Sequence, residues 1–67
     1  MNLIEGLQKE MQRVRELKAE YDALPGGVGF FGSATMKVAL ERTDKAIADS
    51  DVVAELRCYE ELKTITG

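Results

Sequence analysis

The chain has 67 residues, 31% of them charged, and a net charge of −3 with no histidine and one cysteine. Nucleic-acid binding normally needs a clustered basic face, so this charge balance gives no support to a nucleic-acid partner. A single thiol excludes an internal disulfide, and without imidazole it leaves too few ligands for a zinc site. We therefore expect neither a metal nor another cofactor.

The sequence contains no membrane or export signal that we can identify. No apolar run approaches the ~20 residues that cross a bilayer, and residues 1–5 lack the basic and apolar regions of a signal peptide. A lone cysteine is typical of a reducing compartment. We therefore expect a cytoplasmic protein with no membrane partner, formed by one small domain over residues 1–67. A domain of this size is marginally stable alone, which favours self-association.

The first predicted element is a long helix over residues 3–24. Asn2 is a plausible N-cap, with Glu5 completing a capping box. Apolar residues recur at helical spacing and form a wide stripe, which suits a helical bundle: Leu3, Leu7, Met11, Val14, Leu17, Tyr21 and Leu24. The opposite face carries Glu5, Lys9, Arg13, Glu16 and Glu20, and we interpret it as solvated and salt-bridged.

A glycine-rich loop over residues 25–33 follows this helix. It contains Pro25, four of the six glycines and both phenylalanines. Residues 27–32 match the G-x-G-x-x-G dinucleotide fingerprint, but that site requires a strand before the loop and a βαβ unit around it. Here the loop follows a predicted helix and the chain is too short for two such units. We interpret the match as accidental and the loop as a reversal between helices.

Phe30 and Phe31 are the most informative residues of this loop. Each phenylalanine can bury about 150–250 Å², so two of them are costly to leave in water. Consecutive residues in an extended segment point in opposite directions. We therefore expect one ring to close the end of the bundle and the other to face an interface, and the sequence does not decide which.

The second predicted helix spans residues 34–49, with Ser33 as its N-cap. Its apolar positions follow helical spacing and predict an inward face. That face consists of Met36, Ala39, Leu40, Thr43, Ala46 and Ile47. Residues 49–51 are Asp-Ser-Asp, which compete with helix continuation and predict a tight break. A break this short indicates an antiparallel helix pair.

The third predicted helix spans residues 52–64, and we expect an inward face made of Val52, Val53, Leu56, Tyr59, Leu62 and Ile65. Cys58 lies at the edge of that face. Because the chain has no histidine that could act as its base, we interpret Cys58 as a packing residue. The complete pattern predicts an all-α, three-helix hairpin-type bundle, in which two shorter antiparallel helices fold back against the long first helix.

These features favour a non-enzymatic protein-interaction or assembly module, a small accessory or regulatory protein. The long first helix has more apolar surface than two short helices can cover, so we expect a homodimer. Its interface candidates are Leu7, Met11, Val14, Leu17, Tyr21, Phe30 and Phe31. The alternative is a small-molecule or anion-binding domain, in which the glycine loop and the N-terminus of the second helix hold the ligand at Gly32, Ser33 and Thr35.

Overall fold

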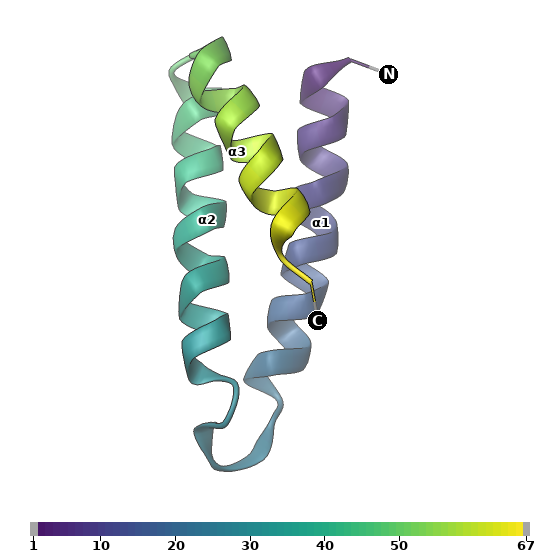
Figure 1. Ribbon diagram of the computed structural model, residues 1–67, viewed down its shortest axis with the longest axis vertical. Helices are drawn as coiled ribbons and strands as arrows, with labels where there is room; N and C mark the ends of the chain where they lie inside the picture. The colour runs from purple at the N-terminus through teal and green to yellow at the C-terminus, as the bar shows by residue number, and fades with distance from the viewer. Residues whose placement is uncertain (1, 67) are drawn as a thin grey trace.

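The computed structural model describes residues 2–66 as a compact bundle of three α-helices (Figure 1). Helix α1 spans Leu3–Asp22, α2 spans Phe30–Ala48 and α3 spans Val52–Thr64, and a single 3-10 turn, η1, spans Pro25–Gly27. Helices α1 and α2 form an antiparallel hairpin, and α3 lies against the half of that hairpin remote from the loop. The predicted all-α, three-helix fold is confirmed.

All three helices contribute to one hydrophobic core, and the apolar stripes predicted for the first two helices are confirmed except at Leu24, which is exposed. Leu7, Met11 and Val14 of α1 have no exposed surface, and Leu62 of α3 is equally enclosed. The remaining buried apolar residues are Met36, Ala39, Leu40, Ala46 and Cys58. Thr43 is the buried polar residue of this stripe, and its hydroxyl donates to the Ala39 carbonyl at 2.8 Å, which satisfies it within its own helix.

The start of α1 agrees with its sequence signal, whereas its end lies two residues earlier than expected. The Asn2 side chain accepts a hydrogen bond from the Glu5 amide at 2.8 Å and caps the helix. At the other end, Leu24 takes an extended conformation with φ −69° and ψ 137°. Leu24 precedes Pro25, whose ring disfavours helical geometry in the residue before it. The helix therefore ends at Asp22.

Helix α2 begins at Phe30 rather than at residue 34, so the prediction of Ser33 as its N-cap is wrong. Gly29 occupies the N-cap position and provides no side-chain cap, and Ser33 is a buried residue of the first turn. The reversal itself is confined to the residues before Gly29. Within it, Gly26 and Gly27 have φ values of 67° and 72°, which side chains with a Cβ rarely tolerate.

The early start of α2 follows from a close approach between α2 and the end of α1. A Cβ atom added to Gly29 would lie 2.2 Å from the Tyr21 carbonyl oxygen. A Cβ on Gly32 would lie 2.4 Å from the Tyr21 ring. Gly29 therefore requires glycine, because its neighbour is backbone, whereas a side chain at Gly32 would require the Tyr21 ring to move. One turn of α2 thus packs its bare backbone directly against Tyr21.

The N-terminus of helix α3 is capped as expected, but the side of the helix that faces the core differs from the predicted one. The Asp51 carboxylate accepts from the Ala54 amide at 3.1 Å, which confirms residues 49–51 as a break and a cap. The buried residues of α3 are Glu55, Cys58 and Leu62. The expected inward residues at its start are exposed, Val52 by 58%, Val53 by 61% and Leu56 by 51%. That part of the predicted inward face is wrong. Small side chains line the junction of α2 and α3 instead: Ala46 on α2, and Ala54 and Cys58 on α3.

Arg13 attaches the end of α3 to α1. Its guanidinium donates to the carbonyl oxygens of Leu62 at 2.7 Å and Ile65 at 2.8 Å, and its Nε donates to Glu10 at 3.1 Å. The last carbonyls of a helix lack partners within the helix and carry partial negative charge, so a cation is favoured there. The expectation that Arg13 belongs to a solvated face is therefore wrong. Arg13 is a C-terminal cap supplied by another helix.

The close approach at Gly29 is testable by substitution. Gly29→Ala should lower the free energy of unfolding by about 1–3 kcal/mol, because the added methyl group overpacks a backbone contact. Gly26→Asn is the matched control, since its site is open and Asn tolerates positive φ. Urea unfolding followed by circular dichroism measures both. Equal stability of the Gly29→Ala and Gly26→Asn variants would contradict the contact.

The Arg13 cap makes a second prediction. Arg13→Ala removes two charge-assisted hydrogen bonds that join α1 to α3, and it should cost about 1–3 kcal/mol in unfolding free energy. Arg15→Ala, at an exposed position of the same helix, should stay within about 0.5 kcal/mol of the parent. Amide hydrogen exchange should show the loss of protection concentrated in α3. Uniform loss across all three helices would argue against a local cap.

Candidate functional site

The chain segment that carries the helix reversal contains no charged residue, although Asp22 lies beside it. Residues 23–36 include no Asp, Glu, Lys or Arg, although 31% of the whole chain is charged. They form the last residues after α1, the reversal and the first two turns of α2, the part drawn at the foot of Figure 1. Four apolar side chains are exposed there: Leu24 by 44%, Val28 by 77%, Phe30 by 72% and Phe31 by 86%. We call these four residues the tip surface.

Both phenylalanines of the tip surface project outward, so the expectation that one of them closes the bundle is wrong. They occupy successive positions of the first turn of α2 and diverge by about 100° around its axis. The inward side of that turn is taken by Gly29 and Gly32, whose backbone contacts Tyr21. No space remains there for a phenyl ring. The close approach of the two helices thus displaces both rings into solvent.

The interface candidates on α1 divide into two groups. Leu7, Met11 and Val14 are fully enclosed by this chain's own helices and present no surface to a second copy. Their assignment to an interface is wrong for this fold, because α2 and α3 together cover the stripe on that half of α1. Leu17 and Tyr21 lie closer to the tip and are only partly buried. They remain candidates, next to Phe30 and Phe31.

A groove runs from the tip to the end of α3. It has a volume of about 310 Å³. Its walls come from both arms of the hairpin and from the C-terminal segment, namely Tyr21, Phe31, Gly32, Thr35, Met36, Thr64, Ile65 and Thr66. Figure 1 shows the reason for its position: α3 ends about halfway along the hairpin, and the face that it covers continues beyond it uncovered. The groove is the part of the hairpin face that α3 does not reach.

The contacts of Ser33 and Thr35 oppose the anion site predicted at Gly32, Ser33 and Thr35. Because α2 starts earlier, the Ser33 amide already donates to the Gly29 carbonyl at 2.9 Å. The Ser33 hydroxyl donates to the Asp22 carboxylate, and the Thr35 hydroxyl donates to the Phe31 carbonyl at 3.0 Å. The Ser33 amide and the Ser33 and Thr35 hydroxyls are thus used within the chain, and the Asp22 carboxylate lies beside Ser33. This arrangement opposes the alternative reading of the loop.

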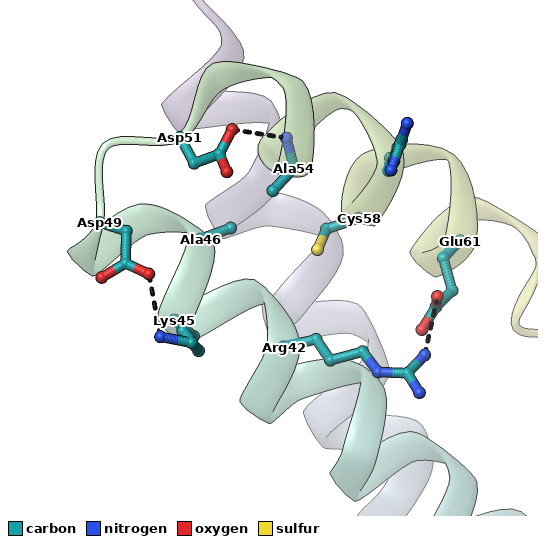
Figure 2. Close-up of a pocket in the computed structure, with 9 residues that line it drawn as sticks. Arg42, Lys45, Ala46, Asp49, Asp51, Ala54, Cys58 and Glu61 are labelled. Atoms are coloured by element: carbon teal, nitrogen blue, oxygen red, sulfur yellow. Dashed lines mark hydrogen bonds and ion pairs between the residues drawn. The ribbon is translucent and has the colours of Figure 1, made fainter.

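A second pocket of about 370 Å³ lies between α2 and α3 (Figure 2). Cys58 and the small residues Ala46 and Ala54 line it, together with three cationic and three acidic side chains. Several of these charges are already in use: Arg42 pairs with Glu61 at 3.5 Å, Lys45 pairs with Asp49 at 3.0 Å, and Asp51 caps α3. Cys58 has no histidine that could act as its base, and it packs as a core residue. The pocket therefore contains no nucleophilic site that we can recognise.

Two further features concern the part of the chain from residue 2 to residue 66. No helix there is long and apolar enough to cross a membrane. No group of three or more Cys, Asp or Glu residues there has a geometry that could hold a metal ion. Comparison with protein-family models, with curated proteins and with solved structures finds no match for this chain. The functional assignment therefore depends on the geometry alone.

Sequence reasoning identified Phe30 and Phe31 but missed Leu24 and Val28 as members of the tip surface. Leu24 belongs to the apolar stripe predicted for the first helix, and the sequence analysis does not single out Val28 within the glycine-rich loop. The signal that could have found both is the uncharged run over residues 23–36. Contiguous apolar surface often marks an interaction site.

Asp22 links the two arms of the hairpin near the tip, and its titration is testable. The Lys18 ammonium at 2.8 Å, and then the Ser33 hydroxyl, hold the pKa of Asp22 below its ordinary value of 3.8. A carboxyl group with a lowered folded-state pKa stabilises the protein above its unfolded pKa, and this contribution is lost as pH falls through the folded value.

The stability difference between the parent and an Asp22→Asn variant should therefore be constant from about pH 5 to pH 8 and should shrink below about pH 4. Urea unfolding at a series of pH values measures this difference. Asp44→Asn, at an exposed position of α2, serves as the control. A difference between parent and Asp22→Asn that grows on acidification would contradict the assigned contacts.

Proposed function

We propose that the protein is a non-enzymatic interaction and assembly module, a small cytoplasmic accessory or regulatory protein that forms a homodimer through its tip surface. The observation that carries this proposal is the exposure of Phe30 and Phe31 at 72% and 86% on a segment, residues 23–36, that contains no charged side chain. Aromatic residues are enriched at the centres of protein interfaces and at their energetic hot spots.

The area of the tip surface is compatible with a weak dimer. A phenylalanine can bury about 150–250 Å², so the two exposed rings alone leave about 300 Å² of apolar surface in water. Adding Leu24 and Val28 brings the patch to about 500 Å², within the range of the largest patches on monomeric proteins, which are often functional. Two such patches would bury about 1,000 Å² in total, near the lower limit for a specific interface. We expect a dissociation constant of about 1–100 μM.

The charge distribution favours a second copy over charged partners. A net charge of −3 makes two copies repel each other over most orientations. Residues 23–36 contain no charged side chain, so two copies that meet through this segment do not bring like charges of the segment together. The same segment offers no Lys or Arg to a nucleic acid or to an anionic lipid headgroup. We therefore propose neither a nucleic-acid nor a membrane partner.

Sedimentation equilibrium from about 1 μM to about 500 μM tests the proposal. The parent should pass from monomer to dimer, and the Phe30→Ala, Phe31→Ala double variant should remain monomeric throughout. That variant should fold normally, because both rings are exposed and Ala is a better helix former.

The matched control is the Val52→Ala, Val53→Ala double variant, which removes exposed apolar groups from the first turn of α3 at the opposite end of the rod. It should dimerise like the parent. A monomeric parent at every concentration would overturn the dimer. Loss of the dimer in the control alone would move the interface to α3, and binding of the monomer to phosphatidylcholine vesicles would assign the tip to lipid instead.

A further inference from the structure

Two contacts within the chain hold the walls of the groove beside the tip in place. Its upper wall is the C-terminal segment, and Arg13 holds the carbonyls of Leu62 and Ile65 at 2.7 Å and 2.8 Å. Its base is the contact between Gly32 and Tyr21, where the two helices cannot separate without losing their close packing. The groove is thus preformed, and a group that enters it does not need to order it first.

The chemistry of the lining is apolar. The hydroxyl groups of its two helical threonines are engaged internally, since Thr35 donates to the Phe31 carbonyl at 3.0 Å and Thr64 donates to the Glu61 carbonyl at 2.6 Å. Met36 and Tyr21 supply a thioether and an aromatic ring, two groups that pack favourably against another aromatic ring. No charged residue lines the groove. The group that fits it is a neutral aromatic side chain.

The volume agrees with that chemistry. An enclosed apolar cavity of about 150 Å³ is enough to bind benzene, and this groove offers about 310 Å³ but is shallow and mostly open to solvent. One phenyl ring can therefore enter with space for the backbone turn that carries it. Phe31 stands on the rim of the same groove with 86% of its surface exposed. A groove and a ring that match it thus lie side by side on one surface.

A ring and a matching groove on the same surface allow two copies to make a reciprocal, two-fold contact. In an isologous interface, a residue of one copy meets a site of the other, and the reciprocal contact follows by symmetry. We propose that in the dimer Phe31 of each copy enters the groove of the other, between Tyr21 and Met36 and below Ile65. Each groove is then completed by the second copy. This inference depends on the proposed function, because it describes the interior of the same dimer.

The two neighbouring phenylalanines provide the sharpest test. Phe31→Ala should raise the dissociation constant at least 10-fold, and by more than Phe30→Ala, an equal change at the adjacent position of the tip surface outside the groove. Thr35→Glu, which places a carboxylate in the groove, should abolish the dimer. Ala34→Glu, which places one on the next exposed residue of α2, should not. Circular dichroism should show that all four variants remain helical.

An isotope-filtered NMR experiment on a mixture of labelled and unlabelled protein gives a direct reading of the contact. It should detect a nuclear Overhauser effect between the Met36 methyl group of one copy and the Phe31 ring of the other. A dimer that tolerates Phe31→Ala, or that shows intermolecular contacts from Phe30 but none from Phe31, would overturn the ring-in-groove contact and leave the proposed dimer standing. A parent protein that stays monomeric would overturn both.

Discussion

The contact on which this structure depends is the close packing of α2's first turn against Tyr21. Gly29 and Gly32 allow backbone to lie where side chains usually separate two helices. This contact determines where α2 begins and how tightly the hairpin closes. It also determines what is exposed, because a turn whose inward side is filled by Tyr21 must project its phenylalanines outward. The apolar tip is therefore a consequence of how the hairpin is made.

The same contact explains why the glycine segment imitates a dinucleotide-binding fingerprint. Gly26 and Gly27 adopt positive φ in the reversal, and Gly29 and Gly32 permit the helices to approach. Every glycine in the segment has a role in folding the hairpin. A phosphate-binding loop uses glycine for related reasons, a sharp turn and a close approach, but there the approaching group is a ligand. Here the approaching group is Tyr21 of the same chain.

The unequal lengths of the helices position the candidate interface. At 1.5 Å per residue, α3 extends about 20 Å, whereas α1 extends about 30 Å. Arg13 binds the carbonyl end of α3 about halfway along α1, so the remaining length of the hairpin has only two layers. The hydrophobic face continues beyond the helix that covers it. In the proposed dimer, a second copy would cover the part of the hydrophobic face that α3 leaves uncovered.

Several features could be predicted from the sequence because they depend on residues close together in the chain. The apolar spacing of α1 and α2, the Asn2 cap and the break at residues 49–51 are local signals, and the structure agrees with each of them. Phe30 and Phe31 could also be singled out, since two aromatic residues among glycines need a reason. The tip surface as a whole could have been found from its lack of charge.

Tertiary structure decided the features that depend on distant residues. Helix α3 carries apolar groups on two sides, Val52, Val53 and Leu56 on one and Cys58 and Leu62 on the other, so its periodicity does not say which side faces inward. The shape of the α1–α2 hairpin selects the side with the smaller residues next to Ala46. Arg13 and Ser33 likewise find their partners, the end of α3 and Asp22, on other helices. Local patterns determined which segments are helical, whereas the fit between helices decided which side chains were buried, capped or exposed.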